Sequence, residues 1–121
     1  MTQTTRKELE SRLIEFAVEI VRIAEKMPAT RAGNHLADQI IRSGTSTALN
    51  YGEAQSAESK RDFVHKLGIV LKELRETQIA LKIIERTKMV PPTSPVMNLD
   101  HECDELIAIF YRSIQTARSK K

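Results

Sequence analysis

The sequence of 121 residues is long enough for one domain with a hydrophobic core and too short for two domains of ordinary size. Hydrophobic residues make up 40% of it, charged residues 29% and aromatic residues 4%, a balance that favours helices around an aliphatic core. The formal net charge of +3 permits nucleic-acid binding without establishing it, and no run of about 18 apolar residues exists that could form a transmembrane helix.

The first expected helix covers residues 5–27. Thr5 and Glu8 have the spacing of a capping box, in which each side chain binds the backbone N–H of the other residue. Apolar residues then recur at intervals of three and four, which predicts a core-facing side. Pro28 cannot continue a helix and disfavours helical geometry in the residue before it, so we expect the helix to end there.

The second expected helix covers residues 31–54, with Thr30 as its N-cap. One side of it consists almost entirely of small residues. Gly44 and Gly52 lie inside it, although Gly in a helix costs about 1 kcal/mol relative to Ala. We expect both glycines to allow a neighbouring helix to approach closely. A polar row on the opposite face, either solvated or in contact with a partner, comprises Gln39, Arg42, Ser46, Asn50 and Glu53.

The third expected helix covers residues 59–88 and has the most regular pattern of the four. Ser59 and Asp62 have the spacing of a capping signature at its start. Its apolar seam follows an unbroken alternation of four and three, which predicts one buried side along the whole helix. The seam residues are Phe63, Leu67, Val70, Leu74, Thr77, Leu81 and Ile84.

The segment 89–98 contains three prolines and is expected to form a loop. Asn98 is a preferred N-cap residue, so the fourth expected helix covers residues 98–118. Its apolar residues again recur at helical spacing, and Cys103 lies among them. This position indicates a buried structural thiol rather than a nucleophile.

Four amphipathic helices joined by short connections predict an all-α fold, an up-down-up-down antiparallel four-helix bundle that forms a single domain over residues 1–121. The lone cysteine excludes an internal disulfide and suits a reducing cytosol. The polar first residues lack the apolar segment of a signal peptide. We therefore expect a cytoplasmic protein without a membrane partner.

Catalytic, metal and cofactor sites find little support in the sequence. His35, His65 and His101 lie on three different expected helices, and no two histidines have the i, i+4 spacing of a helical metal site. The acid-rich run 100–104 is explained by a solvated helix start, because consecutive helical residues point in different directions. There is no Gly-rich phosphate loop and no nucleophile elbow. We expect no enzyme, no metal and no cofactor.

One face of the third expected helix carries cations and no acid. At about 100° per residue, five side chains fall within a single arc, called the basic arc here, which comprises Arg61, Lys72, Arg75, Lys82 and Arg86. Phosphate contacts need little more than such charges, and without an aromatic residue in the arc no base stacking is expected. The arc predicts binding of RNA or DNA through the backbone. The alternative is a solvated face that keeps the protein soluble.

A second apolar stripe lies on the same helix, between the core seam and the basic arc. It comprises Ile69, Glu76, Ala80 and Ile83. Such a stripe is typical of a subunit contact, although a neighbouring helix of the same bundle could also cover it. We favour a homo-oligomer that uses this stripe.

The polar row and the third helix together resemble a known family. Residues 39–54 are similar to the Gln-x-x-Arg-(Ser/Ala)-x-x-Ser-x-x-x-Asn-x-x-Glu-(Ala/Gly) core of bacterial four-helix-bundle proteins encoded in intervening sequences of 23S rRNA genes. The resemblance covers roughly residues 13–110, and its second-helix motif is fairly specific. The positions similar to that family's third-helix pattern are Asp62, Phe63, Leu67, Lys72, Glu73, Glu76 and Thr77.

The resemblance implies a small cytoplasmic bundle that assembles into a ring, with a pentamer as the expected count. It also implies kinship with the accessory protein of diversity-generating retroelements, a basic pentamer that engages RNA and a reverse transcriptase. The motif positions could form a binding surface, or a polar network that sets helix register or a subunit contact. They are Gln39, Arg42, Ser46, Asn50, Glu53, Glu73 and Glu76.

Two functions of different classes follow from these observations. The first is a non-catalytic protein whose oligomeric ring binds RNA or DNA through phosphate contacts of the basic arc, without strong sequence specificity. The alternative is a protein-interaction scaffold, for example an adaptor for a reverse transcriptase, whose charge is incidental. Salt dependence distinguishes the two, because phosphate contacts weaken steeply as salt rises.

Overall fold

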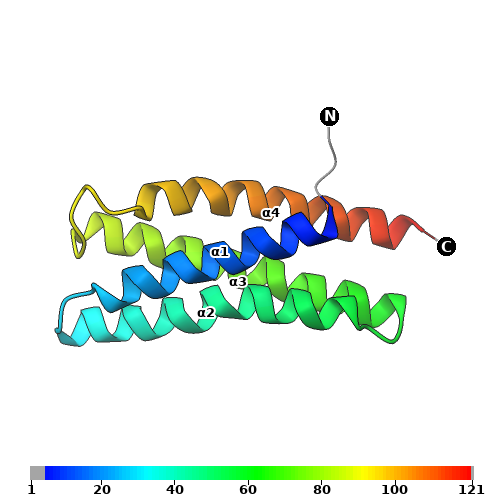
Figure 1. The fold of residues 1–121 in the computed structure, drawn as a ribbon, viewed down its shortest axis with the longest axis horizontal. Helices are drawn as coiled ribbons and strands as arrows, with labels where there is room; N and C mark the ends of the chain where they lie inside the picture. Colours follow the sequence, from blue (N-terminus) through cyan, green and yellow to red (C-terminus); the bar gives the residue numbers. More distant parts are fainter. Residues whose placement is uncertain (1–4, 121) are drawn as a thin grey trace.

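The computed structural model describes residues 5–120 and contains four helices and no strand in that range. Consecutive helices run in opposite directions (Figure 1), so the expected all-α antiparallel four-helix bundle is confirmed. Each helix begins and ends within two residues of its expected bounds. The helices are α1 (Arg6–Glu25), α2 (Arg31–Gln55), α3 (Lys60–Arg86) and α4 (Val96–Ser119).

None of the described helices is long and apolar enough to cross a membrane. The expectation that the first residues form no signal peptide rests in part on residues 1–4, which lie outside the described residues. The segment between α3 and α4 has no regular helix, as its three prolines predicted. Lys88, with a φ of 57°, takes the left-handed conformation that often terminates a helix.

Three of the four helix starts depend on the side chains that the sequence predicted. The hydroxyl oxygens of Thr5, Thr30 and Ser59 each accept a hydrogen bond from the backbone N–H three residues later, at 3.1, 3.0 and 3.0 Å. Glu8 completes the capping box, because its carboxylate accepts from the Thr5 N–H at 3.3 Å. These local contacts satisfy backbone donors that no helical carbonyl can reach.

The expected start of the fourth helix at Asn98 is wrong. The helix begins at Val96, its N-cap position is Pro95, and no side chain caps it. Proline lacks an N–H but its φ suits the first turn of a helix, and the Pro95 carbonyl accepts from the Leu99 N–H at 2.9 Å. Asn98 therefore lies inside the first turn of α4.

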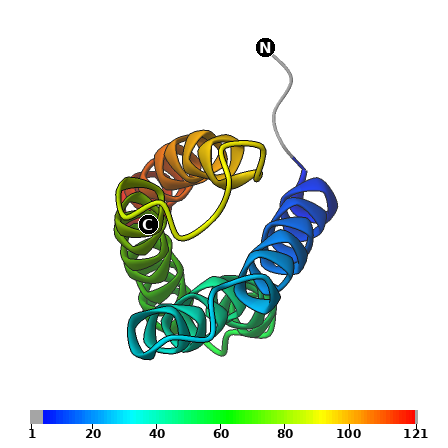
Figure 2. The same cartoon turned by 90° about the vertical axis from the view of Figure 1, so that its left-hand side faces the viewer.

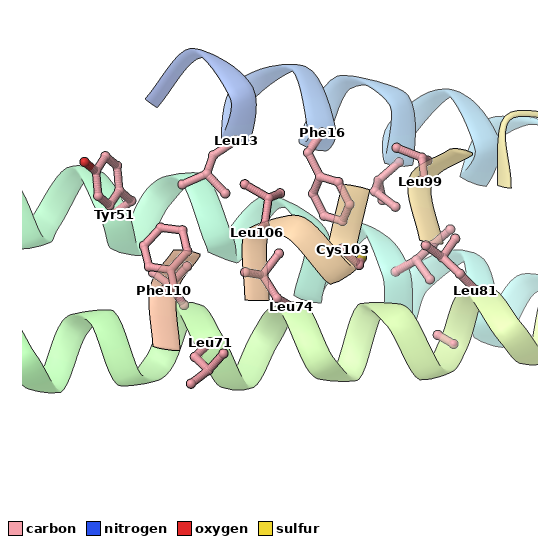
Figure 3. Close-up of a cluster of buried hydrophobic side chains, with 14 of the residues drawn as sticks. Leu13, Phe16, Tyr51, Leu71, Leu74, Leu81, Leu99, Cys103, Leu106 and Phe110 are labelled. Atoms are coloured by element: carbon pink, nitrogen blue, oxygen red, sulfur yellow. The ribbon is translucent and has the colours of Figure 1, made fainter. Parts of the chain in front are cut away.

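The core is aliphatic, with a few aromatic rings at its centre (Figure 3). Phe16 of α1 and Phe110 of α4 are almost completely buried. Tyr51 of α2 packs edge-on against Phe110, with the ring centroids 5.6 Å apart, so side chains of the diagonal helices α2 and α4 meet inside the bundle. The seam of α3 is buried from Leu67 to Ile84, as its spacing predicted.

The bundle is not equally closed on its four sides. Helices that are neighbours in the sequence pack along their length, whereas α1 and α4 lie further apart (Figure 2). Leu13 of α1 and Leu106 of α4 are nevertheless fully buried. An ion pair also joins these two helices, since an Arg12 nitrogen lies 2.6 Å from a Glu102 oxygen.

The two glycines inside α2 have different surroundings. A Cβ added to Gly44 would lie 2.8 Å from Cγ2 of Ile20 in α1, so the expected close approach of a neighbouring helix is confirmed there. A Cβ added to Gly52 would meet nothing within 4 Å. The expectation of close packing at Gly52 is therefore wrong, because this residue lies on an open side of the helix.

Candidate nucleic-acid interface

The basic arc lies on the outward side of α3, since the opposite side of this helix is buried in the core. Its exposed members form no ion pair with any acid of residues 5–120. At 1.5 Å of rise per residue, the first and last of them lie roughly 38 Å apart along the helix axis. The exposed and unpaired cations are Arg61, Lys72, Arg75 and Arg86.

Lys82, the fifth member of the basic arc, is bound within the protein. Its ammonium group lies 3.0 Å from an oxygen of Asp100 in α4, and Gln78 donates to the other oxygen at 2.9 Å. Burial alone would raise the pKa of Asp100, but the hydrogen bonds from Lys82 and Gln78 outweigh it and hold this pKa below its ordinary value. Lys82 therefore joins α3 to α4, and four cations remain for a ligand.

The side of α3 that faces α2 has the opposite charge. Glu73 is 7% exposed, and one carboxylate oxygen of Glu73 and one of Glu76 are buried without a hydrogen-bond partner in the described part of the chain. Arg42 of α2 lies 4.0 Å from Glu73 and 3.8 Å from Glu76, close enough for attraction but too far for a hydrogen bond. Burial first, and then the neighbouring Glu76 carboxylate, raise the pKa of Glu73 above its ordinary value.

The polar row of α2 runs along its seam with α3. Asn50 donates to the Ser46 hydroxyl at 2.8 Å, one helical turn away. Glu53 accepts from Lys66 of α3 at 2.6 Å, and this hydrogen bond raises the pKa of Lys66. Gln39 is half-buried. Together with Arg42, the row thus makes contacts within α2 and to α3.

Two comparisons place this arrangement among known proteins. The family described as 23S rRNA-intervening sequence protein matches the chain over residues 8–112. The chain belongs to this family. The crystal structure of a protein with unknown function from the S23 ribosomal protein family of Bacteroides thetaiotaomicron VPI-5482 is similar to it. The two chains are 30% identical, with a TM-score of 0.82 over 91% of this chain and 97% of that one.

No curated protein sequence matches the chain. The range matched by the 23S rRNA-intervening sequence protein family contains the whole basic arc, the polar row of α2, Glu73 and Glu76. These residues therefore all lie in the part of the chain that the family matches. The last seven residues of α4, about two helical turns, lie beyond the matched range.

The residues of the second apolar stripe of α3 differ in their exposure to solvent. Ile83 is 44% exposed, while Ile69 and Glu76 are half-buried. Ala80 is 4% exposed and belongs to the core, so its placement in a subunit contact is corrected. Its short side chain lies on the packed side of α3, where other core residues cover it.

Sequence reasoning missed a buried hydrogen bond between α2 and α3. The hydroxyl oxygens of Ser43 and Thr77 lie 2.8 Å apart, and both residues are fully buried. The Thr77 hydroxyl also lies 2.8 Å from the Glu73 carbonyl oxygen, which accepts from it. A signal existed, because Thr77 stands in the apolar seam of α3 and a buried hydroxyl needs a partner.

The three histidines of the protein are not brought together. His35, His65 and His101 are exposed on α2, α3 and α4. Within residues 5–120, no group of three or more His, Cys, Asp and Glu side chains is arranged to hold a metal ion. Cys103 is fully buried as expected, and burial raises the pKa of its thiol to about 12, so it stays protonated at neutral pH.

Proposed function

We propose that this member of the 23S rRNA-intervening sequence protein family binds RNA or DNA without catalysis and without strong sequence specificity. The four free cations of the basic arc would bind the phosphate groups of the nucleic-acid backbone. The observation that carries the proposal is their unpaired state on one exposed helix side. By contrast, Arg12 and Lys82 form ion pairs that join helices of the bundle.

The chemistry of the basic arc favours the nucleic-acid backbone over the bases. The other residues on the same face of α3, His65, Gly68 and Ile79, offer no Phe, Tyr or Trp ring on which a base could stack. Arginine and lysine bind phosphate oxygens whatever the sequence. Four such contacts predict that the logarithm of the association constant falls with the logarithm of salt concentration with a slope of about −3 to −4.

The test is a charge reversal at the centre of the basic arc, Lys72→Glu with Arg75→Glu, in a titration against labelled RNA and duplex DNA at low and moderate salt. We expect binding to be abolished while helicity stays intact, because both side chains are exposed. The matched control is Lys7→Glu with Arg31→Glu. It makes the same change in net charge at two helix starts, where acids are tolerated. Unchanged affinity of the reversed variant at low salt contradicts the proposal.

We also propose that the protein acts as a homo-oligomer, with a pentamer expected, through Ile69, Glu76 and Ile83. The exposed Ile83 supports this, as do the carboxylates of Glu73 and Glu76, whose buried oxygens lack a hydrogen-bond partner among residues 5–120. Ile83→Glu should lower the mass measured by sedimentation. An unchanged mass for this variant contradicts the assignment of the contact.

A second candidate function is a protein-interaction scaffold, for example an adaptor for a reverse transcriptase. Its support is a shallow apolar hollow on the outer side of α1 and α2, where Ile14 is 48% exposed and Leu49 66%. Surfaces of this kind mark protein contacts. Weak nucleic-acid binding that does not change with salt, together with tight capture of a protein partner, favours this candidate over the first.

A further inference from the structure

A second basic region lies at the end of the bundle where α1 and α3 begin and α4 ends (Figure 1). The side chains there surround a hollow of about 820 Å³, which we call the end hollow. Arg6 comes from α1, Lys60 from α3, and Arg112 and Lys120 from the last part of the sequence. Residues from both ends of the chain therefore meet at one place.

The charge of the end hollow is of one sign. Its four cations are all exposed, and no Asp or Glu of residues 5–120 lines it. The whole protein has a formal net charge of only +3, so this one site concentrates more positive charge than the protein carries overall. Like charges gathered in a concave site raise the local concentration of anions.

Among the residues that the structure describes, internal contacts account for only one of these cations. The Lys60 ammonium group donates to the backbone carbonyls of Arg118 and Lys120, so it joins the start of α3 to the end of α4. The side chains of Arg6, Arg112 and Lys120 form no ion pair with any acid of residues 5–120. Three cations thus remain for a ligand.

The lining of the end hollow also contains uncharged groups of two kinds. Ser113 and Thr116 of α4 supply hydroxyl groups beside the cations. Phe63 and Ile109 supply apolar surface, and both belong to the half-buried layer that packs on the core. Cations and hydroxyls bind phosphate oxygens, while an apolar wall suits the organic part of the same ligand.

We propose that the end hollow binds phosphate, and that the phosphate is the terminal one of a nucleic-acid strand held along the basic arc. The identification of this phosphate as the end of a nucleic-acid strand rests on the function proposed above. Arg61 of the basic arc and Lys60 of the end hollow both lie in the first turn of α3, so the basic arc ends within one helical turn of the hollow. A terminal phosphate carries up to two charges, and an internal phosphodiester carries one, so three free cations favour the terminal group.

The test compares three oligonucleotides of one sequence, with a 5′-phosphate, a 3′-phosphate or neither, together with inorganic phosphate alone. The wild-type protein should bind one phosphorylated form about tenfold more tightly than the unphosphorylated one, because the terminal group adds charge-assisted hydrogen bonds. This preference should disappear in Arg6→Gln with Arg112→Gln. It should persist in the control Lys7→Gln with Arg118→Gln, which removes the same charge from neighbouring positions of α1 and α4.

The outcomes test two points separately: whether the end hollow binds phosphate, and whether that phosphate is the end of a nucleic-acid strand. Equal binding of all three oligonucleotides by the wild type, or a preference that survives Arg6→Gln with Arg112→Gln, overturns the strand-end proposal even where the basic arc binds nucleic acid. Inorganic phosphate that raises the unfolding temperature of the wild type but not of this variant supports the phosphate site. If no oligonucleotide binds in that case, the function proposed above fails and the ligand is free phosphate. Circular dichroism of both variants confirms that the helices are intact.

Discussion

On the outward side of α3, four cations are exposed and form no ion pair within residues 5–120, whereas on the side facing α2 Glu73 is buried and half-buried Glu76 has one carboxylate oxygen withdrawn from water. Both sides belong to the same helix, and they differ in whether they face solvent or a neighbouring helix. An exposed charge contributes little to folding, about 0–1 kcal/mol even when paired, so the outward side can serve a ligand. A buried charge loses its hydration, so the inward side affects stability.

The largest expected effect comes from two consecutive residues on the two sides. Leu74→Ala should lower the free energy of unfolding by about 2–5 kcal/mol, because Leu74 is fully buried and its removal leaves a cavity. Arg75→Ala, on the exposed side, should change it by less than about 0.5 kcal/mol. Urea denaturation measures both. Similar losses for the two variants would show that the outward side is covered in solution.

A smaller effect tests the same contrast between a packed and an open side on α2. Gly44→Ala should lower the free energy of unfolding by about 1–3 kcal/mol, because its Cβ would lie 2.8 Å from Ile20. Gly52→Ala should raise it by about 0.4–1 kcal/mol, since the position is open and Ala restricts the unfolded chain. Thermal unfolding distinguishes the two. Stabilisation by both variants would mean that α1 and α2 are less tightly packed than the structure shows.

The smallest expected effect is the pH dependence contributed by Glu73. Its pKa is raised in the folded protein, so the folded state binds the proton more tightly than the unfolded state does. The charged carboxylate therefore costs stability above the folded pKa, and stability should rise as the pH falls through that pKa toward the ordinary value. Glu73→Gln should remove this rise, because the amide does not titrate. The exposed Glu85→Gln should keep it, and parallel curves for wild type and Glu73→Gln contradict the assignment.

Local signals in the sequence predicted most of the fold. The caps at Thr5, Thr30 and Ser59 and the seam of α3 involve residues three or four apart, which the helix itself brings together. The one wrong helix start, at Asn98, failed because Pro95 allows a first turn without a capping side chain. Periodicity likewise placed the basic arc on an exposed side.

The tertiary structure decided which residues of each sequence pattern are exposed, bound or packed against a neighbouring helix. Lys82 is bound to Asp100, Ala80 is covered by the core, and Gly52 has no helix against it, although each has the spacing of its neighbours in the pattern. The end hollow depends on Arg6 and Arg112, which are far apart in the sequence and meet only because α1 and α4 have ends at the same end of the bundle. Spacing along a helix determines the direction in which each side chain points, but only the packing of the other helices determines what that side chain contacts.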